Sequence, residues 1–254
     1  SNHATGFAGT GELLNCYVTD GYSGNIGTAA APLAADFDGD VEIAGRGAFY
    51  GLAGDVVGRT LVSVVEGRTT VQLTGDHPEL EVSQGFVDYD TGTLTAYVMG
   101  DAAGTGRLKV GESATFTAGY VDGGILSALK LPSTFKITSG RASLEGSTAP
   151  SGVWNLDGGT IELKARADID KMALGASCLL RLMTPTAIVL GGTGTGDYFE
   201  HRQGARLDLT KQTSSLTFSG VIKRGRGATI LNAGSTQSGG GLETGFGDGD
   251  FPTI

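Results

Sequence analysis

The chain has 254 residues, a formal net charge of -9 and 44 glycines, and charged residues make up 18% of it. The acidic balance argues against general nucleic-acid binding, because a surface that follows the phosphate backbone needs clustered lysine and arginine. The densest basic run, Lys223-Arg224-Gly225-Arg226, is short and is typical of a solvated turn or a subunit contact. The glycines have no strict period of three, which excludes a collagen-like chain and indicates a turn-dense globular protein.

Residues 1–58 are predicted to form a loop-rich N-terminal arm, because Gly, Ala and Asp are frequent there and the aromatic residues follow no period. The first residues lack the positive and apolar regions of a signal peptide, and no apolar run is long enough to span a membrane. We therefore expect a soluble protein with no membrane partner.

Three aspartates in this arm, Asp36, Asp38 and Asp40, alternate as they do at the start of an EF-hand calcium loop. The rest of that loop does not follow, because Val41 stands where the loop needs glycine and Gly47 where it needs glutamate. Calcium binding by these aspartates stays open beside the alternative of an Asx-rich turn.

Residues 59–234 are predicted to form a strand-rich body. Short runs rich in β-branched and aromatic residues recur there, bounded by Gly, Asp, Ser or Asn. The predicted strands are 61–65, 70–73, 80–82, 93–99, 107–110, 114–117, 125–131, 134–138, 152–156, 160–165, 178–183, 187–190, 206–210, 215–218 and 229–231. Only 169–174 is predicted as a helix, since glycine interrupts most other windows of ten residues. Residues 235–254 are predicted to form a glycine-rich tail, with an apolar end that could order against a neighbouring subunit.

Two all-β architectures fit this body. Segments 114–117, 134–138, 160–164 and 206–210 alternate apolar and polar residues as the inward strands of a β-solenoid do. The sequences Asp122-Gly123-Gly124 and Asp157-Gly158-Gly159 instead fit the hairpins of an antiparallel sandwich or jelly roll. We predict an all-β fold with a short parallel β-helix body and extended terminal arms, and the antiparallel sandwich is the alternative.

One segment supports the solenoid. Residues 215–234 contain Leu216-Thr217-Phe218-Ser219-Gly220-Val221-Ile222, then a glycine turn and a further strand. This pattern resembles the repeat of autotransporter passenger β-helices, although basic residues stand here where that family usually has Ser and Gly. The resemblance implies solenoid geometry. In its acidic composition, strand-rich body and loop-rich termini, the chain is also similar to trimeric phage virion proteins of the capsid cement, decoration, short fibre or spike type.

No cofactor is expected. Segment 187–196 looks like a strand entering a dinucleotide-binding glycine loop, but the third glycine position of that motif falls on Asp197 and no βαβ unit follows. His3, His77 and His201 are too far apart in sequence for a zinc motif. Metal ligands therefore remain undefined.

No catalytic residue is assigned. The carboxylate pairs Asp88 with Asp90 and Asp168 with Asp170 would each share a strand face, as acid pairs of polysaccharide-cleaving β-helices do, but such pairs are common by chance. Cys16 and Cys178 have no metal or redox spacing, and a single long-range disulfide between them stays open. Cys178 and Trp154 lie in apolar runs and are predicted to be core residues.

The sequence thus predicts a non-enzymatic structural protein located in a virus particle. We expect a capsid cement or decoration subunit that contacts itself as a homotrimer and the major capsid protein. The alternative is a β-helix that binds or cleaves carbohydrate, such as a tail spike or an adhesin.

Overall fold

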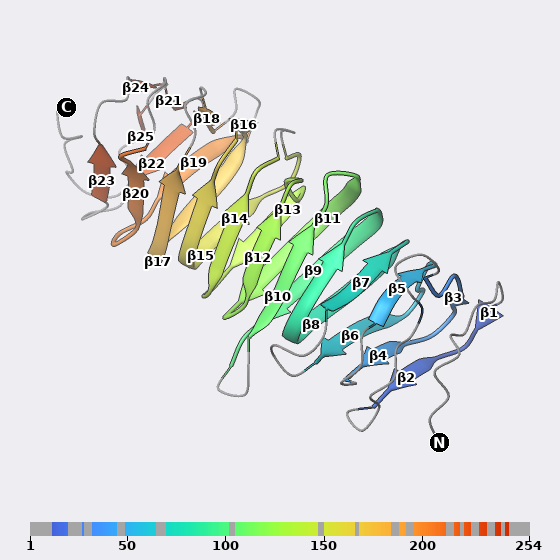
Figure 1. The fold of residues 1–254 in the computed structure, drawn as a ribbon. Helices are drawn as coiled ribbons and strands as arrows, with labels where there is room; N and C mark the ends of the chain where they lie inside the picture. Colours follow the sequence, from blue (N-terminus) through green and yellow to red (C-terminus); the bar gives the residue numbers. More distant parts are fainter. Residues whose placement is uncertain are drawn as a thin grey trace. The chain divides into compact units, whose positions relative to one another are not determined.

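The structure is a computed structural model, and it is all-β (Figure 1). It describes residues 12–19, 27, 32–44, 49–64, 70–101, 105–146, 150–165, 168–183, 188–191, 196–211, 216–218, 221–224, 229–232, 237–239 and 242–243. None of these residues is helical. The predicted helix at 169–174 is wrong, since two strands with a one-residue gap occupy it.

The chain divides into two compact units, and unit 1 is Ser1–Lys130. Its strands are β1 (Glu12–Leu13), β2 (Cys16–Val18), β3 (Asp36–Phe37), β4 (Val41–Ile43), β5 (Phe49–Ala53), β6 (Arg59–Ser63), β7 (Thr70–Thr74), β8 (His77–Tyr89), β9 (Gly92–Met99), β10 (Gly106–Val110), β11 (Ala114–Asp122) and β12 (Ile125–Ala128). Five of them lie within 1–58, where the sequence predicted only a loop-rich arm.

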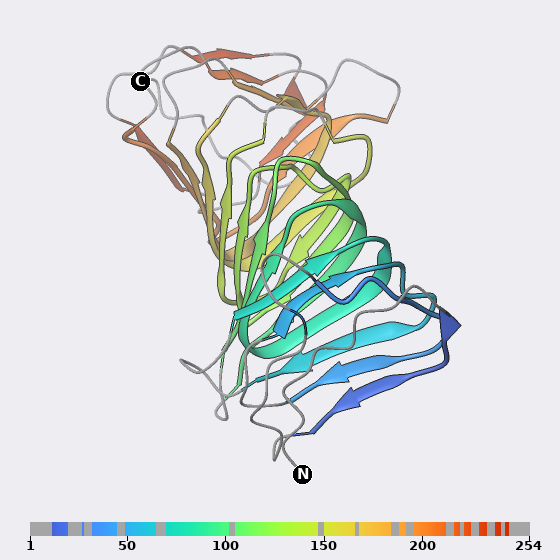
Figure 2. The same ribbon diagram turned by 45° about the vertical axis from the view of Figure 1, so that its right-hand side comes forward.

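The strands of unit 1 stack in parallel, as Figure 2 shows in its blue and green part. One ladder joins β2, β4, β6, the first half of β8, β9 and β11. A second joins β5, β7, the second half of β8, β10 and β12. Because β8 serves both ladders, the chain turns a corner within one strand. This is the predicted β-solenoid, and the antiparallel sandwich is wrong.

Alternation along each strand builds the core of unit 1. Ile43 pairs with Val62, Val62 with Val82, and Val82 with Val98, so that one inward column runs through four strands. All four side chains are buried. β-branched residues suit this position because they pack well on a pleated surface.

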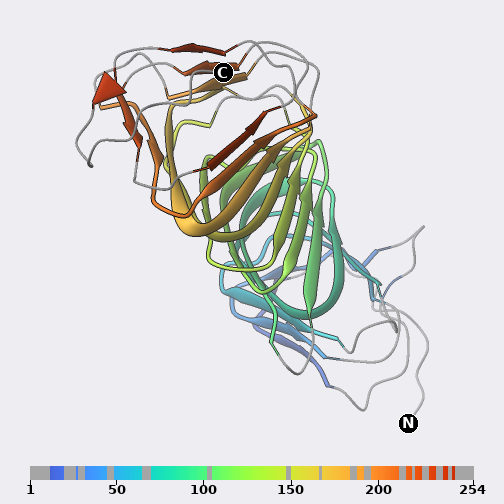
Figure 3. The ribbon, with the colours of Figure 1, turned by 90° about the vertical axis from the view of Figure 1, so that its left-hand side faces the viewer.

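Unit 2 is Leu131–Ile254. Its strands are β13 (Thr134–Ile137), β14 (Arg141–Leu144), β15 (Trp154–Leu163), β16 (Asp168–Ile169), β17 (Lys171–Leu182), β18 (Ile188–Leu190), β19 (Tyr198–His201), β20 (Arg206–Leu209), β21 (Leu216–Phe218), β22 (Val221–Arg224), β23 (Thr229–Asn232), β24 (Gln237–Gly239) and β25 (Leu242–Glu243). Figure 3 shows its yellow to red strands from another side.

Three parallel ladders join the described strands of unit 2. The first joins β13, the start of β15, the start of β17, β19, β22 and β25, and the second joins β14, the ends of β15 and β17, β20 and β23. The third joins β16, β18, β21 and β24. The autotransporter-like segment 215–234 therefore supplies β21, β22 and β23, one to each ladder.

The predicted hairpin at 157–159 is absent. Gly158 and Gly159 lie inside β15, where the register shifts between Leu156 and Gly158, and the strand continues in parallel with β17. A bulge of this kind bends a strand without reversing it. The glycines therefore mark a corner of the solenoid.

Aspartates fix one corner of unit 1. The Oδ1 atoms of Asp36, Asp55 and Asp76 accept the main-chain N–H groups of Asp55, Asp76 and Thr93, at 2.9, 2.8 and 2.6 Å. We call these three residues the aspartate column. Each carboxylate satisfies an amide of the next turn, which the strand ladders leave unpaired at the corner.

Candidate functional site

Two of the three aspartates considered for calcium binding, Asp36 and Asp40, accept main-chain amides. Asp36 belongs to the aspartate column, and Asp40 Oδ1 accepts the amide of Arg59 at 2.9 Å, while Asn15 Oδ1 accepts the amide of Asp40 at 2.8 Å. Within the described residues, no group of three His, Cys, Asp or Glu side chains could hold a metal ion. These positions are Asx-type corners, and the geometry does not gather Asp36, Asp38 and Asp40 around one point.

The two candidate acid pairs lie in different units. Asp88 in β8 forms an ion pair with Lys109 in β10, with 3.1 Å between Oδ1 and Nζ. Asp90 follows β8, and its main-chain N–H donates a hydrogen bond to Leu73 O at 3.1 Å. Asp168 lies in β16, and Asp170 O accepts the amide of Tyr198 at 3.0 Å. The main chains of Asp90 and Asp170 thus form part of the solenoid pairing.

The described histidines and both cysteines are interior or half-buried. His77 lies in unit 1, and His201 lies in unit 2, where its Nε2 is 3.0 Å from Ala205 O. His3 lies outside the described residues. Cys16 and Cys178 are free thiols, so the long-range disulfide is absent from this structure. Burial, with a smaller contribution from Asp157, raises the pKa of the Cys178 thiol to about 12, which leaves it protonated and poorly nucleophilic at neutral pH.

The remaining sequence motifs occupy structural positions. β18 runs into Gly191, and the next described element is the strand β19, so the dinucleotide-binding pattern of strand, loop and helix is not formed in the described part. Lys223 and Arg224 end β22, while 225 and 226 lie outside the described residues. Trp154 is a core residue, as predicted.

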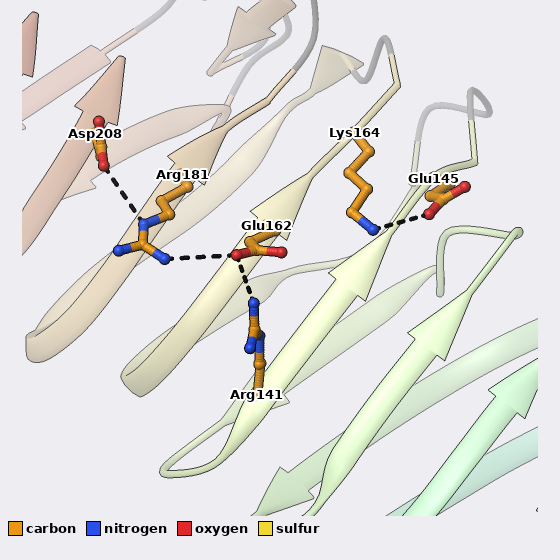
Figure 4. A network of polar contacts seen from close by, with 6 residues as sticks. All are labelled: Arg141, Glu145, Glu162, Lys164, Arg181 and Asp208. Atoms are coloured by element: carbon orange, nitrogen blue, oxygen red, sulfur yellow. Dashed lines mark hydrogen bonds and ion pairs between the residues drawn. The ribbon is translucent and has the colours of Figure 1, made fainter. Parts of the chain in front are cut away.

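The outward face of unit 2 carries an ion-pair ladder, which we define as Arg141, Glu162, Arg181 and Asp208 (Figure 4). Glu162 Oε1 lies 2.8 Å from Arg141 Nη2 and 3.5 Å from Arg181 Nη1, and Arg181 Nε lies 3.4 Å from Asp208 Oδ2. The Glu162 side chain is only 10% exposed. Positive and negative groups therefore alternate from strand to strand along the stack.

Asp208, at the far end of this ladder, has a lowered pKa. Burial alone would raise the pKa of Asp208, but hydrogen bonds from Thr210 and the charge of Arg181 hold it below its usual value. The carboxylate stays ionised at neutral pH and keeps its pair with Arg181. The ladder thus stabilises the stack, and each of its ions already has a partner.

We expect Glu162→Gln to lower the free energy of unfolding by about 1 kcal/mol, because both arginines are partly exposed and solvent screens their attraction. Urea unfolding followed by circular dichroism measures this loss. Glu145→Gln is the matched control, since Lys164 is the one ion-pair partner of Glu145 among the described residues and both side chains are about 40% exposed. Its expected loss is about 0.3 kcal/mol. Equal losses in the two variants would contradict a special role for the ladder.

The outward face of unit 1 carries a stacked pair of tyrosines. Tyr97 in β9 and Tyr120 in β11 are register partners, and their rings stack at 4.7 Å between centroids with 11° between planes. Burial, Tyr120 and Glu79 raise the pKa of Tyr97. Because each ring covers one face of the other, the pair offers less ring surface for stacking on a sugar.

Sequence reasoning missed the aspartate column, the ion-pair ladder and the tyrosine pair. Their members lie on successive turns, so only the register brings them together.

Because none of the described residues is helical, none of them forms a membrane-spanning helix. Comparisons with protein-family models, with curated proteins and with solved structures find no match to this chain.

Proposed function

We propose that this chain is a non-enzymatic structural protein of a virus particle. In this proposal it is a capsid cement or decoration subunit that assembles as a homotrimer and contacts the major capsid protein. Its action would be mechanical, with contacts spread over a stiff surface that stabilise a shell.

The observation that carries the proposal is the pairing of outward groups along the stack. In unit 2, the ion-pair ladder links β14, β15, β17 and β20 through side chains, in addition to the main-chain pairing. In unit 1, Arg59 pairs in the same way with Glu79 and Glu81 of the next turn. Nearest-neighbour contacts of this kind resist deformation along a solenoid.

The carbohydrate-cleaving alternative has less support. It requires a carboxylate poised as an acid or base, whereas Asp88 is bound by Lys109 on the neighbouring strand. Release of reducing sugar from bacterial capsule, abolished by Asp88→Asn or Asp168→Asn, would establish that alternative instead.

The proposal is tested by light scattering coupled to size-exclusion chromatography. We expect a mass of about three chains, because the proposed subunit is a homotrimer with closed threefold symmetry. A strict monomer across a wide concentration range would overturn the trimeric assembly.

The reading frames beside the gene give a second test, and a major capsid protein among them would support the virion assignment.

A further inference from the structure

One interior column of unit 1 contains a histidine among apolar residues. Phe37 pairs with Val56, and His77 pairs with Leu94. Val56 N donates to Asp76 O at 2.8 Å, which places Val56 beside the turn that carries His77. All four side chains of this column are buried, and His77 has no exposed surface.

Inside the core, the imidazole contacts one polar side chain and one aromatic ring. Its Nδ1 lies 2.9 Å from Thr60 Oγ1, and Thr60 is also fully buried. The ring of Tyr89 meets it edge to face at 5.7 Å between centroids. Tyr89 in turn donates its hydroxyl proton to Gly75 O at 2.6 Å, so the same small cluster fixes the turn before His77.

The charged groups around His77 are few. Asp55 and Asp76 of the aspartate column attract a proton to the ring, and a hydrogen bond with the main chain of Thr74 acts in the same direction. Burial outweighs these effects and lowers the pKa of His77 to about 4. The imidazole is therefore neutral at pH 7, in keeping with its contacts.

We propose that the turn from Thr74 to His77 is an acid-responsive joint of unit 1, which opens when His77 gains a proton. An imidazolium donates from both nitrogens, so Thr60 Oγ1 can then only accept from Nδ1, and the charge of the ring is costly in a dry core. Opening lets water reach the ring and releases the bonds from Val56 N to Asp76 O and from Tyr89 to Gly75 O. This property is independent of the proposed virion role.

The sign of the effect follows from the lowered pKa. The unfolded chain binds the proton near pH 6.5 and the folded chain only near pH 4, so stability from neutral His77 is complete above pH 6.5 and is lost as the pH falls toward 4. Between pH 7 and pH 4 the opening equilibrium rises on the order of 100-fold from this residue alone.

The experiment is hydrogen exchange of the full chain at pH 7 and pH 4, corrected for intrinsic exchange rates and read by mass spectrometry over peptides that cover 54–98. We expect wild type to lose protection at the amides of Val56, Asp76 and Thr93 at pH 4. His77→Phe keeps an apolar ring in the column and should retain most of that protection. His201→Phe in unit 2 is the matched control and should behave as wild type in these peptides.

Equal loss of protection in wild type and His77→Phe would overturn the proposal, because the opening would then not depend on a proton at His77. If His77→Phe fails to fold, nuclear magnetic resonance of wild type decides the question. A His77 ring that titrates near pH 4 together with loss of the Tyr89 contact supports the joint. A ring that titrates near pH 6.5 with no structural change overturns it.

Discussion

Trp154→Ala is expected to lower the free energy of unfolding of unit 2 by about 3–5 kcal/mol, because it empties a large site in a packed core. The Trp154 side chain has no exposed surface, and its ring lies 5.2 Å from that of Phe135. Its Nε1 donates to Pro132 O at 3.2 Å. The parallel pairing of β15 with β13 and β17 keeps the neighbouring strands apart, so the cavity cannot collapse.

Urea unfolding followed by far-ultraviolet circular dichroism measures this loss. Tryptophan fluorescence cannot be used, because Trp154 is the only tryptophan and the variant lacks it. Trp154→Phe is the control, because it keeps an aromatic ring and loses only part of the volume and the hydrogen bond to Pro132. We expect it to cost roughly half as much as the alanine variant. A loss below about 1 kcal/mol for Trp154→Ala would contradict the described packing.

Gly75→Ala is expected to destabilise unit 1 by about 3 kcal/mol or more. Gly75 has φ of +96°, and an added Cβ would overlap the main-chain carbonyl of Gly54 on the preceding turn. Backbone strain in this region costs about 1–3 kcal/mol, and the overlap adds to it because the carbonyl is fixed within the stack.

Gly196→Ala separates the two contributions. Gly196 has φ of +87°, but an added Cβ would meet no atom of the described residues within 4 Å. This control therefore carries the backbone strain alone and should cost about 1 kcal/mol. Thermal unfolding of both variants measures the difference, and equal losses would show that close approach of the two turns is unimportant.

Alternation of apolar residues was sufficient to predict the fold class. Runs such as 134–138 and 206–210 are strands, and their inward residues Phe135 and Leu207 are buried. The false helix at 169–174 arose at a corner. There β16 ends at Ile169 and β17 begins at Lys171, so the alternation breaks and Ile169, Met172 and Ala173 take the i, i+3, i+4 spacing of a helix.

Four of the five described strands within 1–58 escaped detection because they are short. β3 has two residues and β4 has three, which is too few for alternation to stand out from chance. Their corners follow a pattern that the sequence does contain, since Gly54-Asp55 and Gly75-Asp76 are spaced one turn apart. Read without the register, Asp36 and Asp40 resembled cation ligands. With the register, they bind amides of the next turn.

Side-chain ladders were beyond prediction for a different reason. Arg141, Glu162 and Arg181 become neighbours only through the pairing of β14 with β15 and of β15 with β17. The number of residues per turn varies, because Arg181 is 19 positions after Glu162 whereas Asp208 is 27 positions after Arg181. No fixed period would reveal such a set.

The aspartate column has a direction. Each carboxylate belongs to an earlier part of the chain than the amide it accepts, from Asp36 to Asp55, then to Asp76, then to Thr93. During synthesis the acceptor of every such bond is therefore made before its donor leaves the ribosome. We expect unit 1 to grow from its N-terminal turn, with each completed turn serving as the template on which the following one condenses.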